Sequence, residues 1–191
     1  MSKLSSVVKD PIRWGAIVVG VLILGTIWIG ISQVPASATS SGAIPSPREG
    51  FAAPNFTLET LDGEAVTLSD LRGKAVVINL WASWCPPCRA EMPALQAAYE
   101  ADRDRGLEIV AVNMTYQDSE QDARRFVEDF GLAFTIPLDR EGTVARQYFL
   151  RALPSTFFVG PEGVIEKVVI GGPMSEATIR STVSEMLTEL P

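Results

Sequence analysis

The sequence predicts an α/β fold in which helices cover both faces of a mixed sheet. Two near-continuous apolar runs, Ala75–Trp81 and Leu107–Asn113, have the length and composition of strands that are buried on both faces. Helical patterns alternate with these runs, which favours parallel strands joined by crossover connections. Two further strands joined by a tight turn precede a last helix, so we expect the sheet to be mixed.

The predicted fold opens with a β-hairpin. Residues 55–58 and 65–68 flank an Asp62-Gly63 step, which is a hairpin turn signal. Residues 69–73 then form a turn or a single helical turn. The first buried strand, Ala75–Trp81, follows directly.

The first long helix is expected to begin at Pro86 and Pro87, because missing amide hydrogens cost nothing in the first helical turn. Its apolar positions recur at helical spacing, which predicts an end near Tyr99 or Asp102. The second buried strand, Leu107–Asn113, comes next.

A second helix is predicted after this strand. Asp118 is the expected N-cap, with Gln121 three residues later as its capping-box partner. Gly131 is the expected stop signal.

The rest of the chain alternates short elements before a last helix. We expect a strand at 134–138, a helix at 142–149, strands at 156–159 and 164–170, and a helix at 175–190.

The only two cysteines of the chain, Cys85 and Cys88, lie between the first buried strand and the first long helix. A CxxC in this position is typical of a redox-active dithiol. Structural zinc is the main alternative, but it needs four ligands, and the chain has no histidine and no second cysteine pair. A purely structural disulfide is a weaker alternative, because closing so short a loop removes little entropy from the unfolded chain.

The N-terminus is predicted to be a membrane anchor. Residues 14–31 carry no charge and are long enough to cross a bilayer as a slightly short helix. More bases than acids precede them, so the positive-inside bias places residues 1–13 in the cytoplasm and the chain beyond the anchor, 14–33, across the membrane. A cleaved signal peptide is the alternative, because residues 36–38, Ala-Ser-Ala, resemble a cleavage site.

Beyond the anchor we expect a flexible linker and one domain. Residues 34–50 are rich in Ser, Pro, Ala and Gly without hydrophobic periodicity, and residues 51–191 suffice for one buried core. The chain has 16 Lys and Arg against 23 Asp and Glu. Three of those bases and one acid precede the anchor, which leaves the outer part with a charge of about −9. An acidic surface argues against binding to nucleic acid.

Four stretches carry a family resemblance, and they are 51–58, 68–74, 76–93, and 153–157 followed by Gly163. The most specific is 76–93, Val-Val-Ile-Asn-Leu-Trp-Ala-Ser-Trp-Cys-Pro-Pro-Cys-Arg-Ala-Glu-Met-Pro. On these residues the chain resembles the TlpA, ResA and CcmG group of membrane-anchored thiol-disulfide oxidoreductases in the thioredoxin superfamily. The resemblance implies a thioredoxin-like fold with an added N-terminal β-hairpin and an inserted strand-helix unit. It also implies a cis peptide bond at Pro154, beside the cysteines, and we expect no cofactor and no metal.

Thiol-disulfide exchange assigns different tasks to the two cysteines. Cys85 should sit just ahead of the helix, where unpaired amide hydrogens and the helix dipole lower a thiol pKa, so it is the expected nucleophile. Cys88, one turn inside, is expected to be more buried and to resolve the mixed disulfide.

Two further residues bear on proton transfer. Glu91 shares a helix face with Cys88, and the resemblance implies a glutamate here that exchanges a proton with the cysteines. A carboxylate that merely favours an early helical turn or pairs with Arg89 is the alternative. Asn79 stands where cytosolic thioredoxins carry a buried acid, and an amide cannot titrate.

Four residues around Cys85 are expected to bind the substrate. Trp84 and Pro86 are its neighbours in the chain, and we expect Trp84 to be partly exposed and to line a docking groove. If Pro154 is cis, Leu153 and Ser155 can offer backbone groups to an extended substrate segment.

The protein is expected to act as a reductant. No histidine or lysine lies between the cysteines to stabilise their reduced form, as in strong oxidants. The resemblance implies an integral membrane thiol carrier as electron donor and protein disulfides as substrates, commonly the CxxCH of apocytochrome c. It places the catalytic domain on the extracytoplasmic, periplasmic side of a bacterial-type cell membrane. General or oxidising exchange on secreted proteins is the alternative.

Two other classes of protein are weaker alternatives. A peroxiredoxin needs a threonine three residues before its reactive cysteine, and Ala82 occupies that position. A Cu(I) carrier suits two thiolates, but known carriers of related fold add a histidine, which this chain lacks.

Overall fold

The computed structural model of the chain describes residues 18–22, 24, 45–188 and 190. The chain divides into two units, residues 1–42 and 43–191. In the first unit, residues 18–22 and 24 are helical. Among the described residues, no helix combines the length and the apolar character needed to cross a bilayer. The predicted cytoplasmic segment, and most of the predicted anchor and linker, lie outside the described residues.

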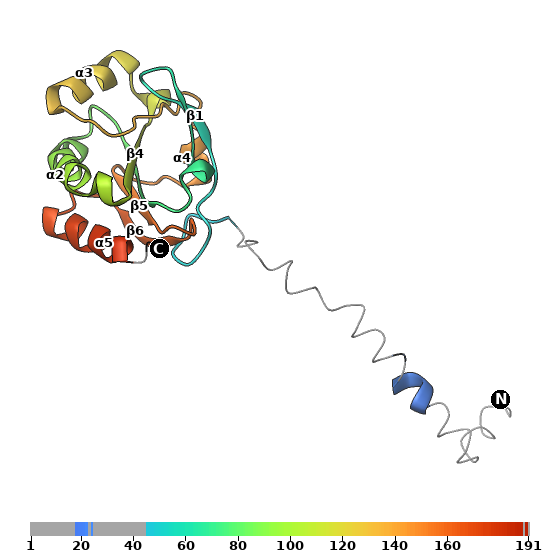
Figure 1. The fold of residues 1–191 in the computed structure, drawn as a ribbon. Helices are drawn as coiled ribbons and strands as arrows, with labels where there is room; N and C mark the ends of the chain where they lie inside the picture. The colour runs from blue at the N-terminus through green and yellow to red at the C-terminus, as the bar shows by residue number, and fades with distance from the viewer. Residues whose placement is uncertain (1–17, 23, 25–44, 189, 191) are drawn as a thin grey trace. The chain divides into compact units, whose positions relative to one another are not determined.

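A four-stranded mixed sheet forms the centre of the second unit, in the order β4-β3-β5-β6 (Figure 1). The strands are β3 (Ala75–Trp81), β4 (Leu107–Asn113), β5 (Ser155–Val159) and β6 (Ile165–Ile170). β3 pairs with β4 in parallel and with β5 antiparallel, and β6 is antiparallel to β5. All seven residues of β3 are buried, as expected for a central strand that is covered on both faces.

Three helices pack on one face of this sheet. They are α2 (Pro86–Asp102), α3 (Glu120–Phe130) and α5 (Glu176–Thr188). Val77 of β3 and Leu95 of α2 belong to the hydrophobic cluster on this face, together with Ile179 of α5. Side chains alternate across a strand, so the neighbouring Val76 and Ile78 enter a second cluster on the opposite face.

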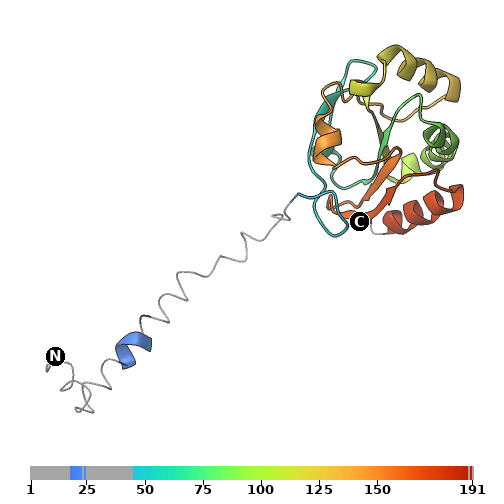
Figure 2. The same cartoon turned by 180° about the vertical axis from the view of Figure 1, so that it is seen from behind.

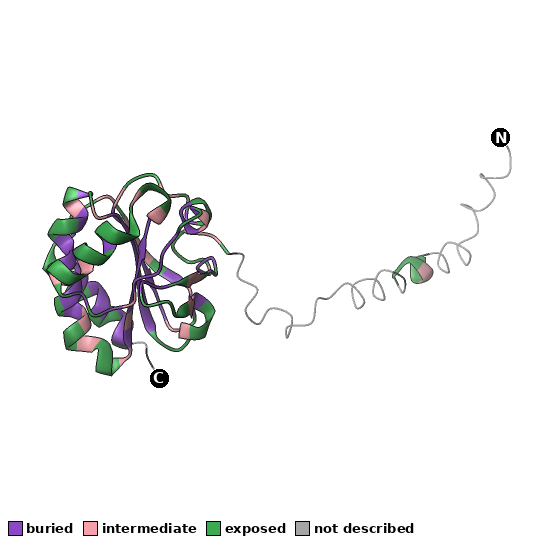
Figure 3. Cartoon of the chain, turned by 90° about the horizontal axis from the view of Figure 1, so that it is seen from above, coloured by how far each residue is buried: buried purple, intermediate pink, exposed green. Residues whose placement is uncertain are grey.

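The opposite face is covered by the N-terminal hairpin and by α4 (Thr143–Gln147), and Figures 1 and 2 show α4 across the sheet from α2 and α5. The hairpin pairs β1 (Thr57–Glu59) with β2 (Ala65–Thr67), antiparallel as predicted. Tyr148 joins the parts of this layer, because its hydroxyl donates to the Pro54 carbonyl at 2.8 Å. Figure 3 shows the strands of the central sheet as buried and the outer sides of the helices as exposed.

Short 3₁₀ turns complete the fold, and they are η2 (Leu68–Leu71), η3 (Arg103–Arg105) and η4 (Thr115–Gln117). η2 confirms the helical turn that was predicted after the hairpin. The bounds of β3 and β4 agree with the prediction at every residue.

The N-cap of α3 differs from the prediction. Ser119, not Asp118, is the cap, and its Oγ accepts from the Asp122 amide at 3.0 Å. Gln121 is therefore not the capping partner. Gly131 ends the helix in the left-handed conformation, as predicted.

The strand predicted at 134–138 does not form. Single bridges link Thr135 to Val110, Leu138 to Asn113, and Pro137 to Thr60. Proline has no amide hydrogen, which interrupts a continuous ladder at this place. The inserted strand-helix unit thus consists of an extended segment with isolated bridges, followed by α4.

Candidate active site

The two cysteines form a disulfide at the start of α2. The Cys85 and Cys88 sulfurs are 2.17 Å apart, and the Cα atoms are separated by 5.3 Å. Cys85 is the N-cap of the helix, and its sulfur accepts from the Cys88 amide at 3.3 Å. Pro86 and Pro87 occupy the first helical positions, as predicted. Both cysteines are buried, with Cys85 2% and Cys88 0% exposed.

A proline loop lies beside the disulfide. The Leu153–Pro154 peptide bond is cis, as the resemblance implied. The Pro154 carbonyl accepts from the Gly171 amide at 2.8 Å, which ties the loop to the end of β6.

Cys85 lines a groove of about 410 Å³, which we call the redox groove. It is lined by Trp84, Cys85, Pro86, Pro87, Tyr116, Gln117, Leu150, Arg151, Ala152 and Leu153. Trp84 and Tyr116 are 56% and 46% exposed, so two aromatic side chains are available to a polypeptide beside the reactive sulfur.

Three of the four predicted substrate-binding residues, Trp84, Pro86 and Leu153, therefore line the same groove as Cys85. Ser155 does not line it. Ser155 is buried in β5, and its hydroxyl donates to the Ala152 carbonyl at 2.7 Å. The Ser155 side chain thus holds the proline loop from inside the domain and is not exposed to a substrate.

A buried polar network lies behind the cysteines. Glu91 is 1% exposed, and its Oε1 accepts from Asn79 Nδ2 at 2.8 Å. The same Asn79 amide donates to Thr156 Oγ1 at 2.8 Å, and the Met174 amide donates to Glu91 Oε2 at 3.1 Å. Burial raises the pKa of the Glu91 carboxyl above its ordinary value and outweighs the two hydrogen bonds, which act in the opposite direction.

Glu91 and the proline loop meet at Gly172. A Cβ atom on Gly172 would lie 2.8 Å from Pro154 Cγ and 3.0 Å from Glu91 Oε2. Only glycine fits at this position without a shift of its neighbours. Sequence reasoning missed Gly172 and Met174, although the Gly-Gly-Pro run at 171–173 was a signal of unusual backbone.

Arg89 does not pair with Glu91, contrary to one alternative for this carboxylate. The Arg89 guanidinium lies over the rings of Phe126 and Phe130, at 5.0 and 5.1 Å from their centroids. The ring centroids of Trp81 and Phe126 are 4.6 Å apart, and Trp81 Nε1 donates to the Ala111 carbonyl at 3.0 Å. Trp81 is thus a core residue.

Asp118 holds the chain that leads into Cys85. Its carboxylate accepts from the amide and the hydroxyl of Ser83, both at 2.7 Å, and from Asn113 Nδ2 at 2.8 Å. Next to it, Trp84 Nε1 donates to the Gln117 carbonyl at 3.0 Å. The loop after β4 therefore fixes the residues just before the nucleophile. Sequence reasoning assigned Asp118 to a helix cap, and no local signal linked it to Ser83.

This arrangement suits thiol-disulfide exchange. A sulfur at a helix N-terminus is activated as a thiolate, and a second thiol one turn away can release a mixed disulfide. The open groove and the exposed aromatic side chains give a polypeptide access to that sulfur.

Comparison with known proteins identifies relatives of this chain. Residues 50–168 match the model of the AhpC/TSA family, and this range includes the cysteine pair and the proline loop. Thiol-disulfide oxidoreductase ResA of Oceanobacillus iheyensis is 42% identical over 128 residues, which cover 65% of this chain and 66% of that protein. ResA of Bacillus subtilis is 41% identical over 131 residues, which cover 69% of this chain and 72% of the relative.

A solved structure shows the same fold. It is a Chlorobium tepidum protein proposed to be a thiol:disulfide interchange protein, DsbE, and it is 29% identical with a TM-score of 0.68. The match covers 73% of this chain and 98% of that structure.

Proposed function

This chain belongs to the AhpC/TSA family, among its ResA-like thiol-disulfide oxidoreductases, and we propose that it is a membrane-tethered, extracytoplasmic reductant of specific protein disulfides. The observation that carries the proposal is the position of Cys85, which caps α2 at the floor of the redox groove. Relatives named thiol-disulfide oxidoreductase, about 41% identical, support the same chemistry.

The proposed reaction transfers two electrons from the dithiol to a protein disulfide. The Cys85 thiolate attacks one substrate sulfur, the substrate disulfide breaks, and the leaving thiolate takes up a proton. Cys88 loses its proton and attacks the Cys85 sulfur, which releases the second substrate thiolate to be protonated. The products are a substrate dithiol and the Cys85–Cys88 disulfide seen in the structure.

Glu91 is the proposed proton acceptor for Cys88. Its Oε2 lies beside Gly172, next to the proline loop, and burial raises its pKa above the ordinary carboxyl value, which favours uptake of a proton. The amide of Asn79 donates to Glu91 and holds one carboxyl oxygen in place.

The tether, the electron donor and the substrate are proposed from the sequence and the family. The uncharged stretch at 14–31 supports a single-pass anchor, and an integral membrane thiol carrier is the proposed donor. Apocytochrome c with an oxidised CxxCH is the proposed substrate, in the course of cytochrome c maturation. General or oxidising exchange on secreted proteins is the second possibility.

A trapping experiment tests this proposal. The Cys88→Ala variant, expressed in its native membrane, cannot resolve the mixed disulfide and should retain the substrate on Cys85. Proteins released by reductant are identified by mass spectrometry, and the Cys85→Ala, Cys88→Ala double variant is the matched control. Capture of apocytochrome c supports the specialised role. Capture of many secreted proteins supports general exchange, and no reductant-sensitive capture would contradict both.

A further inference from the structure

The redox groove has one charged lining residue, Arg151. The other residues that line it, Cys85 among them, have aromatic, aliphatic, small or amide side chains. The Arg151 side chain is exposed, and none of the described carboxylates lines the groove. The groove therefore carries a positive charge in a domain that is acidic as a whole.

Arg151 has no partner within the described part of the chain. No ion pair, side-chain hydrogen bond or ring contact there involves its guanidinium. Several other bases do pair with carboxylates, and these are Lys74, Arg103, Arg105, Arg125, Arg140 and Arg180. Acids outnumber bases in this chain, yet none of the described acids lies within ion-pair distance of Arg151. The N–H donors of Arg151 are thus available to a bound molecule.

Exposed aromatic side chains accompany Arg151. Trp84 and Tyr116 line the same groove, and about half of each side chain is exposed. Phe149, two residues before Arg151, is 62% exposed. Ion pairs on an open surface are weak because water competes for both charges, and apolar neighbours reduce that competition. A carboxylate that reaches Arg151 within the groove is therefore held more tightly than one on the open surface.

The backbone at Phe149 determines how the chain enters the groove. Its φ is 48°, in the left-handed region. The Phe149 amide donates to the Arg146 carbonyl at 3.2 Å, and the Leu150 amide donates to the Ala145 carbonyl at 2.9 Å. This is the Schellman pattern that ends a helix, and glycine is the usual residue at its left-handed position. An exposed phenyl ring kept in this unfavourable conformation, directly before residues that line the groove, points to contact with a partner.

Arg151 lies close enough to the reactive sulfur to contact the residues of a substrate beside its disulfide. Leu153 lines the groove together with Cys85, and its Cα atom is at most about 7 Å from that of Arg151. Within the described residues, neither the amide nor the carbonyl of Leu153 makes a backbone hydrogen bond. An extended substrate segment can pair there, which brings residues near the attacked cysteine within reach of the guanidinium.

We propose that Arg151 makes the redox groove selective for protein disulfides with an Asp or Glu within about three residues of the attacked cysteine. The guanidinium donates two parallel hydrogen bonds to that carboxylate, which a lysine cannot do. This inference rests on the proposed function, because it names the class of segment that the same site takes.

A series of peptide substrates tests the inference with the full chain, reduced and in detergent. Each peptide has one internal disulfide. A single Glu is placed in turn at each position up to about three residues from either cysteine, and a matched peptide has Gln there. The value of kcat/KM is measured by titration of the thiols formed. At the best position this value should be about tenfold higher for the Glu peptide, mainly through KM, because a charge-assisted pair forms.

Variants of Arg151 show whether its charge causes the preference. Arg151→Gln should lower the ratio of the two kcat/KM values to about one, and Arg151→Glu should instead prefer a peptide with Lys at that position. The ratio is compared because a general loss of activity in a variant does not change it. Arg180→Gln, on the exposed side of α5, is the matched control and should keep the wild-type ratio.

Two kinds of failure can be told apart. Equal kcat/KM for every Glu and Gln pair in the wild type, or a preference for Glu that survives in Arg151→Gln, would overturn this inference and leave the proposed function in place. No reduction of any peptide by the wild type would overturn the proposed function itself, and the inference with it.

Discussion

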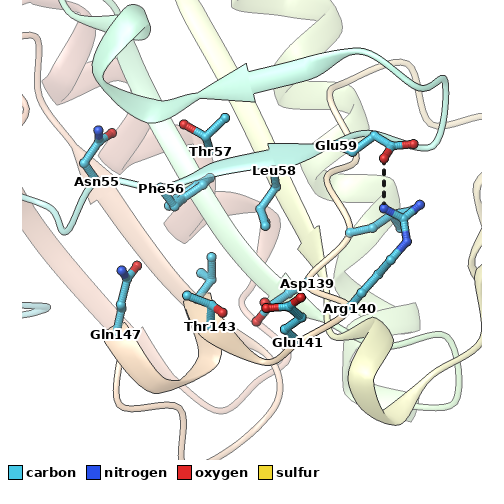
Figure 4. A pocket seen from close by; sticks show the side chains of 12 residues that line it. Asn55, Phe56, Thr57, Leu58, Glu59, Asp139, Arg140, Glu141, Thr143 and Gln147 are labelled. Carbon is cyan, nitrogen blue, oxygen red and sulfur yellow. Dashed lines mark hydrogen bonds and ion pairs between the residues drawn. The ribbon is translucent and has the colours of Figure 1, made fainter.

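The redox groove differs in chemical character from a second cavity, of about 560 Å³, which is lined by β1 and by residues 138–147 (Figure 4) and which we call the acidic cavity. In the groove, reactivity comes from backbone geometry, since Cys85 lies at a helix N-terminus. The acidic cavity is lined by three carboxylates, Glu59, Asp139 and Glu141, and one base, Arg140, and it holds no reactive group. The first site therefore suits a chemical step on a disulfide, and the second differs from it in charge.

Tyr116 connects the two sites. It lines the redox groove, and its amide donates to the Asp139 carbonyl at 3.1 Å. Its ring would lie 3.3 Å from a Cβ atom on Gly142. The backbone of residue 139 thus holds a residue of the groove, while its buried side chain accepts from the Ala145 amide. The variants below test the residues that form the redox groove and the residues that support it.

The largest expected effect is on the rate of disulfide reduction when the attacking sulfur is removed. Cys85→Ser should lower the rate of protein-disulfide reduction by at least about a thousandfold, because the attacking thiolate is removed. The rate is measured with the reduced enzyme by titration of the thiols that appear on the substrate. An unchanged rate would contradict the assignment of Cys85 as the nucleophile.

Removal of the Asp118 carboxylate should disturb the groove without removing its sulfur. Asp118→Ala leaves the Ser83 amide and hydroxyl without their acceptor, and we expect a loss of about 2 kcal/mol in the free energy of unfolding. The value of kcat/KM for a protein disulfide should fall about tenfold, because the residues before Cys85 are less well positioned.

Asp122→Ala is the control for this variant. Asp122 is an exposed carboxylate nearby that bonds to Ser119 and lies 3.4 Å from Arg125. Asp122→Ala should lower the free energy of unfolding by well under about 1 kcal/mol and leave kcat/KM unchanged. Equal effects of the two variants would show that the contacts of Asp118 with Ser83 have no special role.

The pH dependence of stability tests the buried carboxyl behind the groove. Because burial raises the pKa of Glu91, the folded chain holds its proton to higher pH than the unfolded chain does. Wild-type stability should therefore fall as the pH rises above 4.5, the ordinary carboxyl value, through the raised pKa of Glu91. Glu91→Gln has no titrating carboxyl at this position, so its stability should not show the part of the fall that comes from ionisation of Glu91.

Chemical denaturation of both oxidised proteins at several pH values measures this difference. The stability of Glu91→Gln relative to wild type should increase with pH. The same pH dependence in the two proteins would mean that Glu91 ionises alike in the folded and unfolded chains.

The smallest expected effect concerns the connection between the sites. Tyr116→Ala removes an exposed aromatic ring from the groove, and KM for a protein disulfide should rise a few-fold while kcat is retained. An unchanged KM would show that the Tyr116 ring does not contact the substrate.

Sequence patterns predicted the elements that local physics defines. β3 and β4 were located residue for residue, because a near-continuous apolar run of seven residues between turn signals has the length of a strand and is short for a helix. The start of α2 and the positions of Cys85 and Cys88 followed from prolines at the first helical positions. The predictions for α3 and for residues 134–138 were less accurate, because two neighbouring residues can both cap a helix and because Pro137 interrupts pairing.

The sequence by itself determined the fold class and the reactive cysteine pair. The spacing of apolar residues, the prolines at a helix start and the CxxC spacing are all local patterns within a few residues of the chain. Only the tertiary structure decided which polar groups meet. Asp118 joins Ser83 across 35 positions of the chain, and Met174 joins Glu91 across 83. The acidic cavity likewise unites β1 with residues 138–147. A side chain has no local preference for a partner so distant, and the packing of the sheet and helices selects it.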